Sequence, residues 1–144
     1  MAGLEDAIQT ALDAHRGQTD KGGHPYILHP LRLMLSMASE QEKIVAILHD
    51  VIEDNPDYTI DSIRQAGYPD EICEALTCLT KIPGEDYADF IRRIKPNPLA
   101  TKVKLADLAD NMDITRLGNI TESDLQRLSR YKLAWEQLKP RAKP

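Results

Sequence analysis

The chain has 144 residues and a mass of 16.2 kDa, which is enough for one domain with a buried core. Its formal net charge of −5, without a long run of Lys or Arg, argues against nucleic acid as a partner. No apolar stretch approaches the length of a membrane span and the first residues lack the segments of a secretory signal, so we expect a soluble, cytoplasmic protein without a membrane partner.

The first part of the chain predicts two helices separated by a loop. Apolar residues recur at helical spacing over Leu4–His15, and Gly17 ends that helix. Glycines and Pro25 make residues 19–26 a loop of the kind that can enclose a ligand. Pro30 at the first position of the next helix leaves His29 at its cap, where the simplest interpretation is a capping or partly exposed imidazole.

The rest of the chain is also helical in pattern. A capping box at Ser39–Glu42 starts a central helix that we expect to run to Asp54. Further apolar stripes predict helices at residues 59–66, 70–79, 87–94, 99–112 and 121–138, followed by a frayed tail at 140–144. Thr59 and Thr121 are the expected caps of the first and last of these helices. No segment alternates as a strand does. The prediction is one all-α domain spanning residues 1–144, a bundle of about seven or more helices.

The central helix carries four polar side chains in an apolar run. At helical spacing His49 lies one turn before Glu53, and Asp50 lies one turn before Asp54, so two adjacent columns hold all four groups. Burying an imidazole with carboxylates is unfavourable unless something compensates, and a divalent cation does so economically. The alternative is that Glu53 and Asp54 are ordinary solvated acids at a helix end.

A second helix also places carboxylates in an apolar setting, with Asp107 and Asn111 one turn apart. Together with His29, His49 and Asp50, Asp107 completes a set of two imidazoles and two carboxylates from separate helices. Mixed nitrogen and oxygen ligation suits Mn²⁺, Fe²⁺ or Zn²⁺, and so few protein ligands leave positions open for water and substrate. The pattern therefore predicts a catalytic metal site.

The order of His, then His-Asp, then Asp resembles the HD superfamily of metal-dependent phosphohydrolases. Residues 24–30, 48–54, 79–81 and 104–112 are similar to the hydrolase domain of RelA/SpoT homologues and to small alarmone hydrolases, and the similarity extends over nearly the whole chain. The resemblance implies an all-helical HD fold and removal of the 3′-pyrophosphate of guanosine tetra- and pentaphosphate. It also implies one Mn²⁺ held by His29, His49, Asp50 and Asp107.

The resemblance extends to the residues around the metal. Glu53 and Asp54 match the pair that positions and deprotonates the attacking water in the family, and Asn111 matches a nucleotide contact. Four further residues are candidates for contact with a nucleotide substrate: Lys21, Lys81, Arg127 and Tyr131. For each of these four, an exposed side chain that only contacts solvent is the alternative.

Two departures from the family pattern leave the substrate open. Asp20 stands where the family has a substrate-stacking arginine, and Asp113 stands where an arginine usually follows Asn-Met. An aspartate in place of arginine removes attraction for a polyphosphate and adds repulsion. Alternative substrates are another phosphorylated nucleotide, such as NADPH or a nucleoside triphosphate. A third hypothesis is a non-catalytic, metal-bound nucleotide-binding module, against which the retained Glu53–Asp54 pair argues. Nothing in the sequence indicates the oligomeric state.

Overall fold

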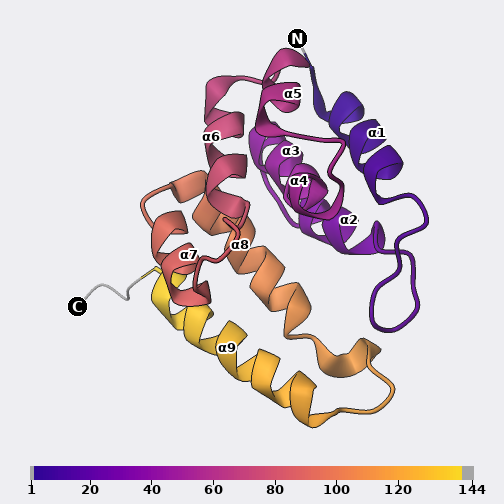
Figure 1. The fold of residues 1–144 in the computed structure, drawn as a ribbon, viewed down its shortest axis with the longest axis vertical. Coiled ribbons are helices and arrows are strands. Elements are labelled where there is room, and N and C mark those ends of the chain that lie inside the picture. The colour runs from indigo at the N-terminus through magenta and orange to yellow at the C-terminus, as the bar shows by residue number, and fades with distance from the viewer. Residues whose placement is uncertain (1, 141–144) are drawn as a thin grey trace.

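The structure is a computed structural model that describes residues 2–140, and it is all-helical there apart from loops and an isolated bridge between Thr19 and Pro25 (Figure 1). The elements are α1 (Leu4–His15), α2 (Leu28–Leu35), α3 (Glu40–Leu48), α4 (Val51–Asp54), α5 (Ile60–Gln65), α6 (Asp70–Leu79), α7 (Tyr87–Ile94), α8 (Pro98–Asn111), a 3-10 turn (Ile114–Arg116) and α9 (Glu122–Leu138). The predicted all-α fold class is confirmed.

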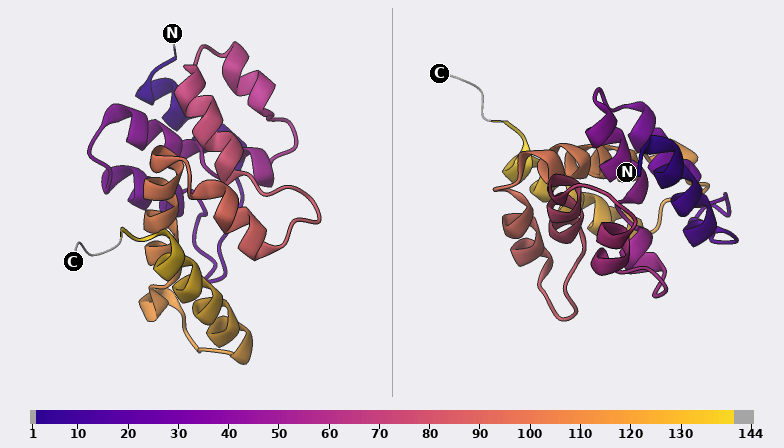
Figure 2. Two further views of the ribbon diagram at one scale, coloured as in Figure 1. Left: turned by 90° about the vertical axis from the view of Figure 1, so that its left-hand side faces the viewer. Right: turned by 90° about the horizontal axis from the view of Figure 1, so that it is seen from above.

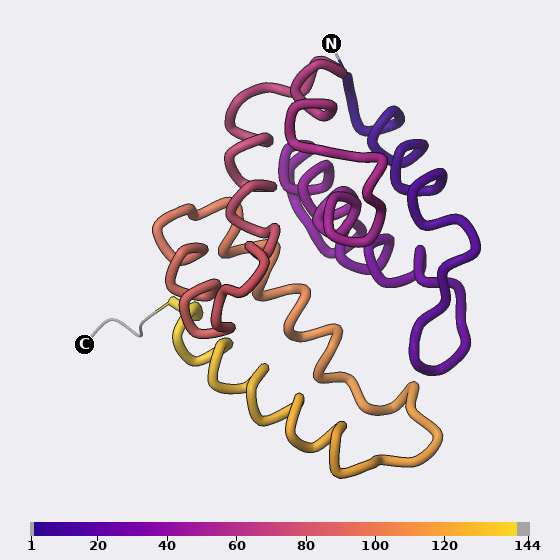
Figure 3. The backbone as a smooth tube through the Cα atoms, viewed as in Figure 1, coloured from indigo at the N-terminus to yellow at the C-terminus, as the bar shows by residue number. Residues whose placement is uncertain are grey.

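Helix α3 forms the centre of the core. Its residues Ile44–Leu48 are all buried, so the helix is apolar on every side along its second half. Helices α1, α2, α6 and α8 pack against it, and the tube drawing shows α3 between α1 and α6 (Figure 3). The buried residues of α1 are His15 and three alanines, Ala7, Ala11 and Ala14, and the small alanine side chains allow a close approach to α3.

The C-terminal part of the fold is built on α8. Helix α9 runs beside α8 at one end of the molecule, and the 3-10 turn joins them (Figures 1 and 2). Helix α7 contacts both α6 and α9. Because α8 also packs on α2 and α3, it brings Asp107 against the N-terminal helices. None of the helices within residues 2–140 is long and apolar enough to cross a membrane.

The expected helix from Ser39 to Asp54 is wrong in one respect, because it breaks at His49–Asp50. Helix α3 ends at Leu48, and Asp50 has φ −107° and ψ 0°, outside the helical region, before α4 begins at Val51. In an unbroken helix, consecutive side chains point about 100° apart. The break lets His49 and Asp50 turn toward the same point, and such backbone geometry often occurs at functional sites.

The start of α2 also differs from the prediction. The helix begins at Leu28 with Ile27 as its cap, so His29 lies inside the first turn and Pro30 is the third helical residue. Proline is tolerated there because the first N–H groups of a helix have no intrahelical partner. The predicted caps Ser39, Thr59 and Thr121 are present, each accepting a hydrogen bond from a backbone N–H. Of the expected tail, residues 141–144 lie outside the described part of the chain.

Candidate metal centre and active site

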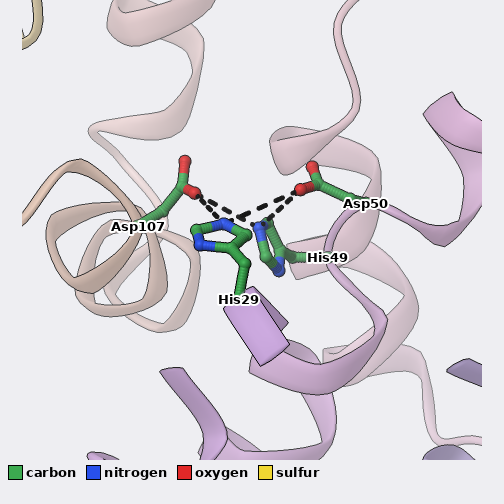
Figure 4. Close-up of side chains that lie close together, drawn as sticks. All are labelled: His29, His49, Asp50 and Asp107. Carbon is green, nitrogen blue, oxygen red and sulfur yellow. Dashed lines mark hydrogen bonds and ion pairs between the residues drawn. The ribbon is translucent and has the colours of Figure 1, made fainter. Parts of the chain in front are cut away.

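Four side chains from three parts of the fold converge on one point (Figure 4). His29 comes from α2, His49 and Asp50 from the junction of α3 and α4, and Asp107 from α8. One donor atom of each residue lies within 4.8 Å of all the others. His29 Nε2 is 2.8 Å from Asp107 Oδ1, and His49 Nε2 is 2.9 Å from Asp50 Oδ2. These are the four residues that the sequence predicts as metal ligands.

Each imidazole is oriented by a bond on its far side. His29 Nδ1 lies 2.6 Å from Asp110 Oδ2, and His49 Nδ1 lies 2.7 Å from the carbonyl oxygen of Ala46. Both partners are acceptors, so each Nδ1 carries the hydrogen and each Nε2 faces the centre. His49 Nε2 is buried and, despite its closeness to Asp50, makes no hydrogen bond. This orientation is the one that histidine ligands of metals adopt.

The charge of the centre also fits a cation. Burial disfavours a charged His29 ring, but its hydrogen bonds to Asp107 and Asp110 outweigh this effect and raise its pKa. The pKa of His49 is likewise raised, against the effect of burial, by Asp50 and Asp107. Without an ion the two rings must carry extra protons to satisfy the carboxylates, and a divalent ion replaces those protons. The four residues therefore form a candidate metal-binding group.

The carboxylates of the centre have partners of their own. The Tyr26 hydroxyl donates to Asp50 Oδ2, and Lys104 Nζ lies 2.9 Å from Asp107 Oδ2. Asn111 Nδ2 donates to Asp107 Oδ1 over 3.2 Å. Burial opposes an ionised Asp107, but Lys104 and the two imidazoles hold its pKa well below the usual range. Asp107 is thus kept ionised, as a metal ligand must be.

Two residues around the centre have no part in the sequence prediction. Asp110, which accepts from His29, is held by two hydrogen bonds from Arg32, of 2.8 and 2.9 Å. Its pKa lies far below the usual range, because the bonds from His29 and Arg32 outweigh burial. A sequence pattern that indicates Asp110 is the presence of a second aspartate one turn after Asp107 in an apolar helix.

Glu53 and Asp54 lie in α4, one helical turn after the candidate ligands His49 and Asp50. The N–H of Asp54 donates to the Asp50 carbonyl over 3.0 Å, so one turn separates the two residues. Glu53 Oε1 accepts from the backbone N–H of Lys81 at 2.5 Å, and Asp54 Oδ2 accepts from Gln18 Nε2 at 3.0 Å. Burial, opposed by these hydrogen bonds, raises the pKa of both carboxyls.

A cavity of about 350 Å³ adjoins the centre. Tyr26 and Asn111, which contact the two carboxylates of the candidate metal-binding group, also line it. Of the five substrate-binding candidates, Lys21, Asn111, Arg127 and Tyr131 line the cavity. Lys81 does not line it, and its backbone N–H supports Glu53 instead. Arg116, which the sequence analysis did not single out, is a further cavity residue.

The two departures from the family pattern also lie in this cavity. Asp20 Oδ1 accepts from the backbone N–H groups of Gly22 and His24, both at 2.9 Å, and so orders the loop. Asp113 caps the 3-10 turn and lies 3.0 Å from Arg116 Nη1. The repulsion expected from Asp113 is therefore partly offset by Arg116.

Comparison with protein-family models finds no match. Among curated proteins, the chain is 32% identical over 143 residues to the bifunctional (p)ppGpp synthase/hydrolase SpoT of Escherichia coli. It is 31% identical over 121 residues to guanosine-3′,5′-bis(diphosphate) 3′-pyrophosphohydrolase of Aquifex aeolicus. A GTP pyrophosphokinase of Streptomyces coelicolor is 29% identical over 126 residues.

These matches cover 90%, 76% and 78% of the chain, but only 20%, 17% and 15% of the respective relatives. The chain thus spans about a fifth of the length of the curated relatives it matches. Their names, which include a synthase and a pyrophosphokinase, describe whole proteins of which the matched segment is a small part. The resemblance expected from the motifs is confirmed: the chain is homologous to a segment of these proteins, consistent with an HD-type hydrolase domain of the RelA/SpoT family.

Proposed function

We propose that the chain is a metal-dependent phosphohydrolase that removes the 3′-pyrophosphate of guanosine 3′,5′-bis(diphosphate). The observation that carries this proposal is the convergence of four metal-capable donor atoms within 4.8 Å beside a nucleotide-sized cavity. The printed names of several relatives support the choice of reaction and substrate. We further propose that residues 1–144 act as one HD-type domain.

The proposed cofactor is one Mn²⁺, held by His29, His49, Asp50 and Asp107. Two imidazole nitrogens and two carboxylates suit this ion, and they also suit Fe²⁺ or Zn²⁺. When bound, such an ion supplies Lewis acidity toward phosphate oxygens and acidifies water.

The chain's own residues supply the remaining chemistry. Glu53 and Asp54 are proposed to orient the attacking water and take its proton, and their raised pKa values bring them closer to neutral pH, where a base is most effective. Water adds to the phosphorus beside the ribose, and the bond to the 3′ oxygen breaks. The products are pyrophosphate and guanosine diphosphate. Lys21, Asn111 and Tyr131 are proposed to contact the nucleotide from the cavity.

One observation favours a second candidate, hydrolysis of a different phosphorylated nucleotide. Arg116 and Arg127 line the cavity, but each is already paired with a carboxylate, Asp113 and Asp124 respectively. Their attraction for a polyphosphate is reduced by these pairs. A substrate with fewer charges than guanosine tetraphosphate is therefore a reasonable competitor.

The test is product release from guanosine tetraphosphate, NADPH and nucleoside triphosphates, each with Mn²⁺ and with a chelator. We expect pyrophosphate from guanosine tetraphosphate, lost on chelation and restored by Mn²⁺. Turnover of another nucleotide alone would favour the second candidate. Absence of metal-dependent turnover on the whole panel would contradict the enzyme assignment and favour a nucleotide-binding module.

A further inference from the structure

A buried histidine outside the metal centre is linked to the proposed proton acceptors. His15 is the last residue of α1 and is 2% exposed. Its Nδ1 lies 2.9 Å from Gln18 Oε1, and Gln18 Nε2 donates to Asp54 Oδ2 over 3.0 Å. The direct separation between His15 Nδ1 and Asp54 Oδ2 is 3.9 Å, too long for a hydrogen bond. Gln18 is therefore the link between them.

The chemistry of the three groups fixes the direction of this link. An ionised Asp54 can only accept hydrogen bonds, so the Gln18 amide must present its NH₂ group to Asp54 and its oxygen to His15. That oxygen is an acceptor, so His15 must carry its hydrogen on Nδ1. His15 Nε2 is buried and has no hydrogen-bond partner, which is consistent with a nitrogen that bears no hydrogen.

We infer that His15 and Gln18 are positioning residues for Asp54: His15 sets the orientation of the Gln18 amide, and the amide fixes one oxygen of the Asp54 carboxylate. This inference rests on the proposed function, because it gives Asp54 a part in the reaction. Within residues 2–140 the other oxygen, Oδ1, accepts no hydrogen bond, so it is the one left to take a proton from water.

The end of α4 needs such support because the helix is only four residues long. A hydrogen bond that does not involve the Asp54 carboxylate also connects this end to α1: Asn55 Nδ2 donates to the Ala14 carbonyl over 3.1 Å. Glu53 is supported differently, by the backbone N–H of Lys81. The two members of the acidic pair thus each have one oxygen fixed, Glu53 by backbone and Asp54 by side chains.

His15 is the residue to test, because Gln18 lines the cavity beside the metal centre and could also contact substrate, whereas His15 does not line it. The His15 ring also packs on Tyr26, with 5.0 Å between ring centroids. Two variants separate these contacts. His15→Phe keeps an aromatic ring against Tyr26 and loses the N–H donor. His15→Asn keeps a donor close to the Nδ1 position and loses the ring.

For His15→Phe we expect kcat to fall roughly tenfold to a hundredfold, as when a catalytic group is misplaced, with KM and bound metal unchanged. His15→Asn should keep most of kcat. Asn55→Ala controls for packing of α4 on α1 and should lower the melting temperature without changing kcat. Unchanged kcat in His15→Phe, or an equal loss in His15→Asn or Asn55→Ala, would overturn the inference.

An Asp54→Asn variant distinguishes the inference from the function on which it rests. Loss of turnover in Asp54→Asn with none in His15→Phe would reject the positioning role alone, whereas full turnover in Asp54→Asn would reject the part assigned to Asp54. A measurement independent of activity and of variants is the ¹⁵N spectrum of the His15 ring in the wild-type protein. We expect hydrogen on Nδ1 and none on Nε2, and the opposite tautomer would overturn the inference.

Discussion

The candidate metal centre and the adjoining cavity differ in how deeply their charged side chains are buried and in what holds them. At the centre, His29, His49 and Asp107 are at most 6% exposed, and each has a second partner that fixes its orientation. In the cavity, Arg116 and Arg127 are partly exposed and paired with carboxylates that also cap nearby backbone. The side chains of the candidate centre are therefore held in one arrangement, whereas the two cavity arginines are held only by pairs at the surface.

The largest effect should come from Asp107→Ala. The change removes a ligand and leaves the Lys104 ammonium, which is mostly buried, without its carboxylate partner. We expect loss of bound metal and turnover at background level, measured by metal analysis of the purified protein and by product release. Normal metal content in this variant would contradict the ligand assignment.

Glu53→Gln should separate metal binding from catalysis. The amide keeps the shape of the side chain but cannot take a proton, so kcat should fall by about 10²- to 10⁴-fold with metal content unchanged. Asp57→Asn removes an equal charge from an exposed position just after α4 and serves as the matched control. Unchanged turnover in Glu53→Gln would remove Glu53 from the mechanism.

Asp110→Ala tests whether the hydrogen bond between Asp110 and His29 Nδ1 orients the His29 ring for metal binding. Loss of the acceptor for His29 Nδ1 frees the ring to turn, and metal affinity should fall about 10- to 100-fold. Arg32→Ala leaves that acceptor in place and should have a smaller effect. Competition with a fluorescent chelator measures both affinities, and a larger loss in Arg32→Ala would contradict this order.

The smallest effects should come from the cavity. Arg116→Ala should raise KM by about tenfold or less with little change in kcat, because its interaction with substrate is already reduced by Asp113. Asp113→Asn should have the opposite sign and lower KM, since it removes one of the two carboxylates paired with Arg116. Steady-state kinetics on the preferred substrate checks both variants. A fall in kcat with unchanged KM would contradict a binding role.

Local chemistry explains which parts of the fold were predictable. Apolar spacing and the caps Ser39, Thr59 and Thr121 identify the helices because these signals act within one turn. The break at His49–Asp50 could not be predicted in this way, since the apolar pattern continues through it. The break lets both side chains turn toward one site, an arrangement that involves residues far apart in the sequence.

The residues of the candidate site also differ in whether the sequence alone could identify them. The four ligand candidates were predictable because residue type and motif order identify them. Asp110 and the pair His15–Gln18 were not, because their roles depend on contacts across the fold. His29 and Asp110 are 81 residues apart, and Gln18 and Asp54 are 36 apart. The substrate candidate Lys81 was chosen for its side chain, but the observed contact with Glu53 is made by its backbone N–H, which residue type does not predict.

The central claim is that four side chains hold one catalytic ion, and a Mn²⁺ titration of chelator-treated protein tests it most directly. Bound Mn²⁺ and pyrophosphate release from guanosine tetraphosphate are followed in the same samples. We expect both to saturate together at one ion per chain, and neither signal to appear in Asp107→Ala. Turnover without bound Mn²⁺, or binding that persists in Asp107→Ala, would contradict the claim.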